Sequence, residues 1–344
     1  MGTAEKLLFE RALAVVLGAS LFAGMVADAR AASSDFYQGK QIKIVIGNSP
    51  GGGFDDHGRL LAQHLGKHIP GHPTIIPQNM PGAATLKAIQ YLITSAPQDG
   101  TVIAIFNPNL IVESLTDAAK IGVDFTKMNF LGSAMSDGRV CFTWHATGLR
   151  TFEDVLKANE VIMGATTKSS NNYTNSAILR NVFGARIKHV LGYPGSTEQY
   201  LAIERGELMG TCGSWSSIPE NLRAEKKIVA FVRYSEAAID GMPEIPYIAD
   251  KARSTEERQL LNLVLVTADL GRPYVLGPNI PPDRLQILRD AFEKTMKDKD
   301  FLASAAKMGL EIANPALGAR IEAIVKDLYA TPAGVLAKMA SAVE

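Results

Sequence analysis

A glycine turn is the first part of this sequence whose residues could bind a ligand. The apolar run 42–46 leads into residues 48–55, which read NSPGGGFD, and a helical pattern begins near Asp55. A strand, a glycine turn and a helix N-terminus together expose backbone N–H groups at a point that attracts negative charge. The turn carries no lysine or arginine. We therefore expect its main chain to hold an anion, which suits a carboxylate that must be released again.

Other chemistry for this turn fits less well. Residues 47–51 match the G-x-S-x-G nucleophile elbow, but that elbow uses the N–H after the serine, and Pro50 has none. A dinucleotide fingerprint needs glycine where Asp56 stands, and no lysine follows the glycines as a phosphate-binding Walker loop requires. A purely structural tight turn remains the alternative.

Three further strand-to-helix turns repeat the pattern. Residues 78–85 read QNMPGAAT, residues 166–173 read TTKSSNNY, and residues 192–196 read GYPGS. Hydroxyls and amides at such positions cap a helix and leave further N–H groups free, so capping and ligand binding are compatible. Ligands of open α/β sheets bind beyond the carboxyl ends of the strands. Four such turns, two in each of two expected domains, predict a cleft between these domains.

The elements that position these turns alternate between extended and helical patterns. Strands are expected at 42–46, 74–76, 102–106, 129–133, 140–144, 161–165, 189–191, 209–212 and 228–234. This alternation predicts an α/β fold with two mainly parallel sheets flanked by helices. After residue 254 the chain is helix-rich apart from 273–276. We expect a discontinuous domain 1 (32–134 and 255–344), an inserted domain 2 (135–254), and two crossing segments that form a hinge.

The N-terminal segment 1–31 has the features of an export signal. Lys6 and Arg11 precede an apolar run, and Ala29-Arg30-Ala31 forms an A-x-A cleavage site. We expect cleavage after Ala31 and a periplasmic protein; an uncleaved anchor is the alternative. Thirty-five basic residues balance 35 acidic ones, so nothing argues for nucleic acid as a partner.

The cysteines, histidines and aromatic residues leave several alternatives open. Cys141 and Cys212 form either a disulfide or two buried thiols. His57, His64 and His68 share one helix face, where we expect half-buried histidines rather than a metal site. Trp215 and Tyr193 are either an aromatic wall of the cleft or part of the core.

Several motifs of the chain together resemble the Bug-type periplasmic receptors of tripartite tricarboxylate transporters. The family pattern P-G-G-G-x-D, with an arginine after it, is similar to Pro50–Asp55 with Arg59. Further matches are Asn79–Ala83 (N-x-P-G-A), Ala96–Thr101 (A-P-x-D-G-T), Tyr193–Gly195 with Gly206-Glu207, and Ile280–Arg284. Departures from the family occur at Tyr173, often histidine, at Ala84, often glycine, and in the run 191–195.

The resemblance implies a two-lobed periplasmic binding protein of the type II-like Venus flytrap form. Such a receptor captures a small organic carboxylate and delivers it to a membrane permease, without catalysis, metal or cofactor, and we expect a monomer. The ligand-binding residues that it implies are Ser49, Gly52, Gly53, Asp55, Gly82, Ala83, Thr166, Thr167, Ser169, Ser170, Asn171 and Tyr193. For Asp55 we expect a role in capping the helix or orienting a water.

Two other functions stay open from the sequence. A secreted hydrolase would use Ser49 or the cluster Asp55, Asp56 and His57. A sensory or scaffold protein would bind acids without a permease. Which carboxylate is bound is left open, because the departures from the family lie in the half of the cleft expected to contact the distal part of the ligand.

Overall fold

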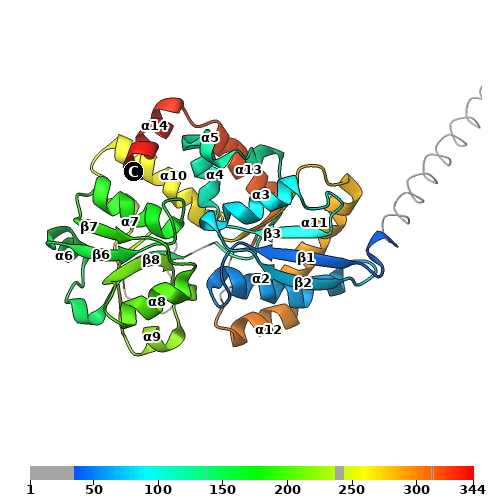
Figure 1. Cartoon of the computed structure of the whole chain (residues 1–344), viewed down its shortest axis with the longest axis horizontal. Helices are drawn as coiled ribbons and strands as arrows, with labels where there is room; N and C mark the ends of the chain where they lie inside the picture. The colour runs from blue at the N-terminus through cyan, green and yellow to red at the C-terminus, as the bar shows by residue number, and fades with distance from the viewer. Residues whose placement is uncertain (1–34, 137, 237–243, 311, 313) are drawn as a thin grey trace, which may run out of the picture.

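The strands form two separate sheets, each the centre of one lobe. The computed structural model describes residues 35–136, 138–236, 244–310, 312 and 314–344. The predicted export signal, residues 1–31, lies outside these residues. Lobe 1, which contains β1 (Gln41–Ile46), and lobe 2, which contains β8 (Gly210–Ser214), stand side by side in Figure 1. Within the described residues, no helix is both long enough and apolar enough to cross a membrane.

Lobe 1 contains a six-stranded sheet in the order β11-β4-β10-β3-β1-β2. Its strands are β1 (Gln41–Ile46), β2 (Thr74–Asn79), β3 (Val102–Ile105), β4 (Asn129–Ser133), β10 (Pro273–Leu276) and β11 (Ala316–Leu317). Strands β2, β1 and β3 run parallel, whereas β10 is antiparallel to both β3 and β4. The amino end of β10 therefore lies at the edge where β1 and β3 have their carboxyl ends.

Lobe 2 contains a five-stranded sheet in the order β7-β6-β8-β5-β9. Its strands are β5 (Arg139–Trp144), β6 (Val161–Gly164), β7 (Ile187–Val190), β8 (Gly210–Ser214) and β9 (Ile228–Arg233). Strand β6 is parallel to β7 and β8, and β5 is antiparallel to β8 and β9. The expected two-lobed α/β architecture is confirmed, and each sheet is mixed.

Helices cover both faces of both sheets. In lobe 1 these are α2 (Gly53–His64), α3 (Leu86–Thr94), α4 (Asn109–Thr116), α5 (Ala118–Ile121), α11 (Pro282–Met296), α12 (Lys299–Lys307) and α13 (Gly318–Tyr329). In lobe 2 they are α6 (Phe152–Lys157), α7 (Asn171–Asn181), α8 (Ser196–Glu204) and α9 (Glu220–Ala224). Helices α10 (Thr255–Asp269) and α14 (Ala333–Ala342) lie across the top of the molecule, where α14 contacts α4, α10 and α7.

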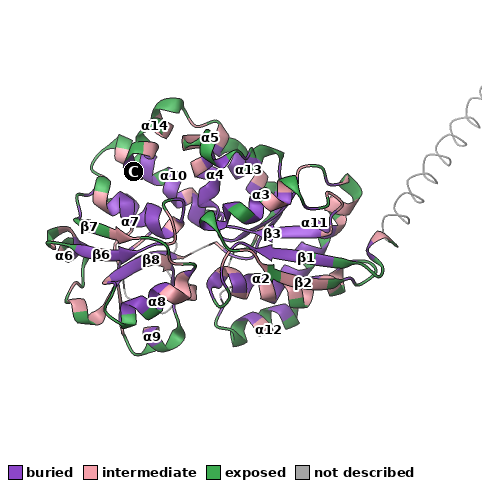
Figure 2. Cartoon of the chain, in the orientation of Figure 1, coloured by how far each residue is buried: buried purple, intermediate pink, exposed green. Residues whose placement is uncertain are grey.

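Apolar periodicity explains which face each element buries. All four residues of β3 are buried, as expected for a central strand covered on both faces. On one face of the lobe 1 sheet, Leu60 and Leu61 of α2 pack with Leu288 and Phe292 of α11. The interior of both lobes is buried in Figure 2, while exposed residues lie on the outer helices and loops. Because the core occupies the faces of the sheets, the sheet edges that face each other between the lobes remain available to form a site.

A disulfide joins Cys141 of β5 to Cys212 of β8. The two residues face each other directly in the antiparallel register of these strands. Both are buried. The structure thus decides between the two alternatives that the sequence left open, and it places a cross-strand bond at the centre of the lobe 2 sheet.

The chain passes from lobe 1 to lobe 2 between β4 and β5, and it returns by way of α10. Arg139, at the start of β5, donates from Nη1 to Thr267 Oγ1 at 2.6 Å and from Nη2 to the Thr267 carbonyl at 2.7 Å. The two connections are therefore bonded to each other between the lobes. The domain limits 32–134, 135–254 and 255–344 stay a prediction.

Candidate functional site

A pocket of about 70 Å³ lies between the lobes. From lobe 1 it is lined by Asn48, Gly53, Phe54, Ala84, Thr85, Asn107 and Arg272. From lobe 2 it is lined by Thr166, Ser170, Asn171, Asn172, Ser196, Gln199, Tyr200, Thr211, Cys212, Gly213, Ser214 and Ser217. Most of these side chains carry a hydroxyl or an amide. The pocket is therefore suited to a small polar ligand that contacts both lobes.

Three helix N-termini converge on this pocket. Helix α2 begins there after Gly52, α7 after Ser170 and α8 after Gly195, and none of these three residues caps its helix through a side-chain hydrogen bond. The first N–H groups of a helix have no partner within the helix, and its dipole makes that end positive. The pocket therefore presents backbone donors and positive potential from both lobes, which favours an anion.

Arg272 adds a full positive charge to these dipoles. It immediately precedes β10, and its side chain is buried, with 2% of its surface exposed. Its Nη2 donates to Ser217 Oγ of lobe 2 at 2.5 Å, and its guanidinium lies 5.1 Å from the centre of the Phe54 ring. A Cβ placed on Gly53 would overlap both the guanidinium and Ser217 Oγ. The sequence reasoning, which found no basic residue at the first turn, missed Arg272.

Asp55 holds the first two glycine turns together and does not line the pocket. Its carboxylate accepts from the Gly51 N–H at 2.9 Å, from Arg59 Nε at 2.8 Å and from Asn79 Nδ2 at 2.8 Å. Burial alone would raise the pKa of this carboxyl, but the bonds from Arg59, Gly51 and Asn79 outweigh burial and lower the pKa below its ordinary value. Asp55 therefore orients the loop and links it to Asn79. The capping or water-orienting role expected from the sequence stays a prediction.

The second turn meets the pocket one or two residues later than predicted. Gly82 and Ala83 are exposed, whereas the next two residues, Ala84 and Thr85, line the pocket. Ala83, Ala84 and Thr85 all have positive φ, between 46° and 80°. Non-glycine residues seldom adopt this region, and such strain often marks a functional turn. Thr85 Oγ1 accepts from the Asn107 N–H at 3.0 Å, which ties the turn to the end of β3.

Asn172 organises the third turn, around Thr166, Ser170 and Asn171 of the predicted site. Its Oδ1 accepts from the Ser170 hydroxyl, from the Tyr173 N–H at 3.0 Å and from the Thr166 N–H at 3.4 Å. Thr167 and Ser169 are not among the lining residues. Three of the five residues proposed for this turn thus lie at the pocket, with Asn172 as their support.

The fourth turn closes one side of the pocket against the first. Thr197 Oγ1 donates to the Gly51 carbonyl at 2.9 Å, and Ser49 Oγ donates to Glu198 at 3.5 Å. A Cβ on Gly52 would lie 3.1 Å from Ser196 Oγ. Ser49 and Gly52 therefore contact lobe 2 rather than line the pocket. Tyr193 packs against the core cluster of lobe 2 that contains Trp215, as in the second of the two alternatives for these aromatic residues.

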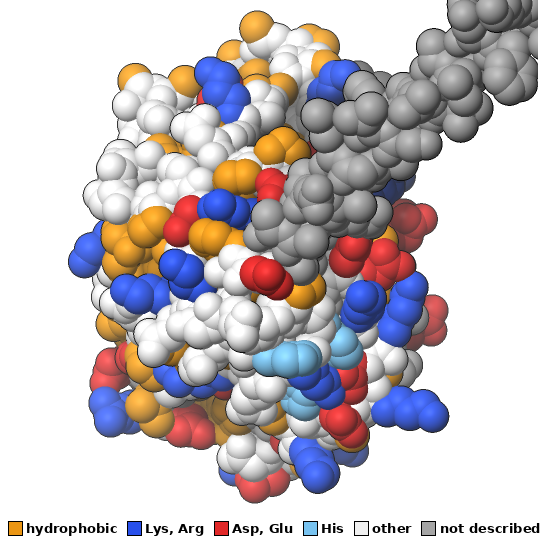
Figure 3. Space-filling view, turned by 90° about the vertical axis from the view of Figure 1, so that its right-hand side faces the viewer, with side chains coloured by type: hydrophobic (Ala, Val, Ile, Leu, Met, Phe, Trp, Pro, Cys, Tyr) orange, Lys and Arg blue, Asp and Glu red, His pale blue; other side chains and the backbone are white. Residues whose placement is uncertain are grey.

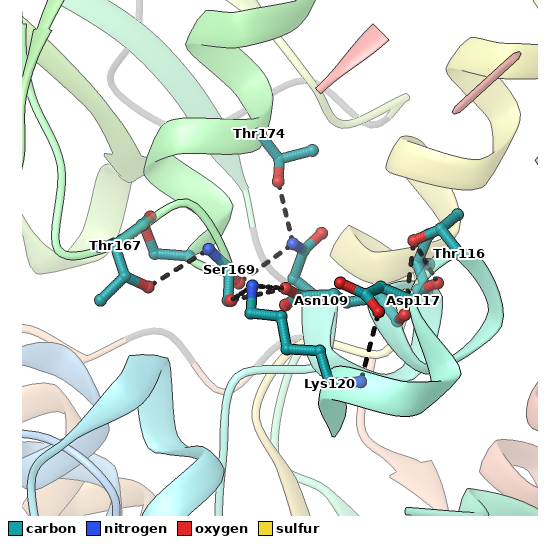
Figure 4. A network of polar contacts seen from close by, with 10 residues as sticks. Asn109, Thr116, Asp117, Lys120, Thr167, Ser169 and Thr174 are labelled. Atoms are coloured by element: carbon teal, nitrogen blue, oxygen red, sulfur yellow. Dashed lines mark hydrogen bonds and ion pairs between the residues drawn. The ribbon is translucent and has the colours of Figure 1, made fainter. Parts of the chain in front are cut away.

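A second set of polar contacts joins the lobes outside the pocket (Figure 4). Ser169 Oγ, from lobe 2, donates to Glu113 Oε1 of α4 at 2.6 Å. Lys120 Nζ donates to the same carboxylate oxygen at 2.6 Å, and Asn109 Nδ2 donates to Thr174 Oγ1 at 2.9 Å. We call these five residues the interlobe clasp. With the contacts of the fourth turn, it links the two lobes to each other outside the pocket.

Many lining residues were missed by the sequence reasoning, although some had a signal. Asn107 follows the third predicted strand, and Ser214 and Ser217 follow the eighth, so the rule that ligands bind beyond strand ends could have found them. Gln199 lies within α8 and Arg272 before β10. Neither carries a local signal, because only the packing of the lobes brings them to the pocket.

The helix-face histidines have other partners. His57 Nδ1 lies 2.8 Å from the Gly53 carbonyl, His64 Nε2 lies 3.0 Å from Ser304 Oγ, and His68 Nε2 lies 2.6 Å from Asp298. Figure 3 shows histidines among lysine, arginine and acidic side chains at the end of lobe 1. No group of three or more metal-ligating side chains occurs within the described ranges.

His189 provides a pH test of the packing that positions α7. Its Nε2 lies 2.8 Å from Ser176 Oγ and its Nδ1 lies 3.2 Å from Arg180 Nη1. Burial, with the charges of Arg180 and Lys168, lowers the pKa of His189 to about 4. The unfolded chain takes up this proton near pH 6.5, so the stability is present above that pH and is lost as pH falls toward 4.

We therefore expect His189→Gln to flatten the acid branch of the stability profile. The wild type should lose about 1–2 kcal/mol more than the variant between pH 7.5 and 4.5, after allowance for solvent screening. Urea unfolding at a series of pH values measures the difference. The exposed His72, changed to asparagine, is the control, and parallel profiles for wild type and His189→Gln would contradict the assignment.

Comparison with known proteins gives similar folds at low sequence identity. No family model matches the sequence. The chain is 24% identical over 308 residues to "UPF0065 protein in gbd 5'region" of Cupriavidus necator, covering 87% of this chain and 88% of that protein.

Solved structures with the same fold include a TctC solute-binding protein from Polaromonas, with a TM-score of 0.61, 18% identity, and coverage of 88% of this chain and 99% of that one. They also include MatC from Rhodopseudomonas palustris with bound malate, with a TM-score of 0.69, 15% identity, and coverage of 89% and 99%. At these identities the similarity shows the fold. The two-lobed architecture implied by the resemblance is confirmed.

Proposed function

We propose that the protein is a periplasmic solute-binding receptor that captures a small organic carboxylate between its lobes and delivers it to a tripartite tricarboxylate-type permease. The observation that carries the proposal is the convergence of three helix N-termini and Arg272 on one pocket. The backbone N–H groups and the Arg272 guanidinium can bind an anion, but neither can act as a nucleophile. The malate of MatC and the TctC description of the Polaromonas protein support the ligand class and the transporter type.

Binding and closure follow from the distribution of these donors. Hydrogen bonds to a charged group contribute about 1.5–3 kcal/mol each, so three or four supply most of a micromolar affinity, about −8 kcal/mol, after ordering costs. Helix α2 and Arg272 belong to lobe 1, whereas α7 and α8 belong to lobe 2. A carboxylate that contacts both sets binds the closed state more tightly than the open one and thereby shifts the lobes toward closure.

The alternative of a hydrolase receives no support from the geometry of its proposed residues. Ser49 Oγ donates to Glu198, and Asp55 is occupied by Gly51, Arg59 and Asn79. Pro50 follows the serine and offers no N–H for an oxyanion. We therefore propose a binding protein without catalytic activity.

A thermal-shift screen against mono-, di- and tricarboxylates tests the function. At least one acid should raise the melting temperature by several degrees in the millimolar range, because a ligand that binds only the folded state stabilises it. The absence of a shift with any acid would contradict the proposal. Turnover of an ester that is lost in Ser49→Ala would establish the hydrolase instead, and capture of a permease from membranes would separate the transporter role from a sensory one.

Ser169→Ala is expected to weaken carboxylate binding about three- to tenfold without contact to the ligand. The substitution removes the donor to Glu113 and so destabilises only the closed arrangement, since the clasp forms between the lobes. Calorimetry gives the affinity, and stopped-flow measurements should show faster release at similar association rates. Glu153→Gln, which disrupts the exposed Lys251–Glu153 pair, is the control. Equal effects of the two changes would argue against the clasp.

A further inference from the structure

Gln199 is a buried amide in the wall of the pocket. It lies in α8 of lobe 2, and 1% of its surface is exposed. Its Oε1 accepts from Asn172 Nδ2 at 3.2 Å and lies 2.7 Å from Thr211 Oγ1, whose single hydrogen has both this oxygen and the Gly164 carbonyl, at 2.8 Å, within reach. The carbonyl end of this amide is therefore bonded within lobe 2.

The orientation of the Gln199 amide is set by backbone groups. The N–H groups of Tyr173 and Thr166 can only donate, and both point at the same end of Asn172, which must be its oxygen. The other end of Asn172 is then its NH₂ group, which donates to Gln199. A reversed Gln199 would set two NH₂ groups against each other. Gln199 Oε1 thus faces Asn172, and Nε2 is left for the pocket.

Gln199 Nε2 has no hydrogen-bond partner among the described residues, and the atom is buried. A buried amide donor without an acceptor is unfavourable, and native proteins usually pair such groups or use them in a site. Gln199 lines the pocket together with its partners Asn172 and Thr211. A ligand oxygen in the pocket would satisfy this donor, whereas an ammonium group would place two donors against each other.

We infer that Gln199 selects ligands that carry an oxygen acceptor on the part lying against lobe 2. The inference rests on the proposed function and narrows its ligand class. The ligand is an acid with a second carboxylate, carbonyl or hydroxyl oxygen, and an acid with an ammonium group in that place is rejected. Gln199 discriminates between these acids because the direction of its NH₂ group is fixed by Asn172 before the ligand binds.

Matched pairs of ligands test the selection. One pair is succinate and β-alanine, and the other is glutarate and 4-aminobutyrate. The two members of each pair have the same number of methylene groups and differ in whether the second end is a carboxylate or an ammonium. We expect the wild type to bind the better diacid at least 100-fold more tightly than its amino-acid counterpart by calorimetry. Equal affinities within a pair would overturn the inference.

Gln199→Glu is the decisive variant. Glutamate keeps one acceptor oxygen for Asn172 and Thr211 but replaces the NH₂ group with a second oxygen. Diacid affinity should fall at least 100-fold, and the preference for the diacid over the amino acid should shrink or reverse. Gln199→Met, which removes the donor without adding charge, should cost about tenfold. The exposed Gln90→Glu on α3 controls for the added charge, and thermal unfolding verifies that each variant folds.

The outcomes separate this inference from the function on which it rests. Diacid binding that is unchanged in both Gln199 variants would refute the role of Gln199 and leave the carboxylate receptor standing. Failure of the wild type to bind any acid in the wider screen would refute the receptor, and the inference with it.

Discussion

Replacing Gly53 by valine is expected to reduce carboxylate affinity at least 100-fold and to leave the fold intact. Gly53 is the first residue of α2, and its Cα faces the Arg272 guanidinium and Ser217 Oγ so closely that a Cβ would overlap both. Arg272 is buried and cannot swing away freely. A branched side chain would therefore push the guanidinium and Ser217 out of their places in the wall of the pocket, and the positive charge that favours the anion would move with them.

The same substitution should also hinder closure. Ser217 belongs to lobe 2 and Gly53 to lobe 1, so the added atoms keep the lobes apart. Calorimetry measures the affinity and circular dichroism the fold, and small-angle scattering should show a more open molecule. Gly334→Val in α14 is the control, because a Cβ there meets nothing within 4 Å. Wild-type affinity in Gly53→Val would refute the placement of the ligand at this turn.

Removal of the Cys141–Cys212 disulfide is expected to cost about 4 kcal/mol of unfolding free energy. The bond closes a loop with a sequence separation of 71 residues, so it restricts the unfolded chain strongly. Strands β5 and β8 are already paired, and we expect the folded lobe to keep its register without the bond. Urea unfolding of Cys141→Ala/Cys212→Ala against the oxidised wild type measures the cost.

The wild type under reducing conditions is the matched control, because it breaks the bond without deleting a side chain. It should lose nearly as much stability as the double variant. Cys212 also lines the pocket. Because the variant melts at a lower temperature than the wild type, part of it is unfolded near that temperature, and it should bind carboxylates more weakly there. A loss below about 1 kcal/mol in both forms would mean that the unfolded chain gains little freedom from cleavage of the bond.

Much of the fold was predictable because the strands carry their burial in the sequence. The run 129–133 is predicted and observed with the same limits, and so is 273–276. Short apolar runs bounded by glycine or proline turns leave few other structures open. The second strand continues to Asn79, beyond the predicted end at residue 76. Pro77 does not end it, because β2 is an edge strand, where a proline is tolerated.

The site was predictable only where local turns form it. Gly53, Thr166, Ser170 and Asn171 lie at the pocket because each belongs to a strand-to-helix turn whose position follows from its own neighbours. Tyr193 is not among the lining residues, because its partly buried ring packs against the core cluster of lobe 2 instead. Glycine and hydroxyl patterns therefore locate the edge of a sheet, but they do not tell which residues of a turn face inward.

The sequence by itself determined the two-lobed architecture and the position of the four turns, because these depend on periodicity and on the glycine and hydroxyl residues at helix starts. The tertiary structure alone brought Arg272 and Gln199 to the pocket. Arg272 reaches the glycine turn because β10 runs antiparallel to β3, which brings the amino end of β10 to the sheet edge where β1 and β3 have their carboxyl ends. Gln199 is oriented by Asn172 across a turn of lobe 2. Both depend on contacts between segments far apart in the chain, which no local pattern encodes.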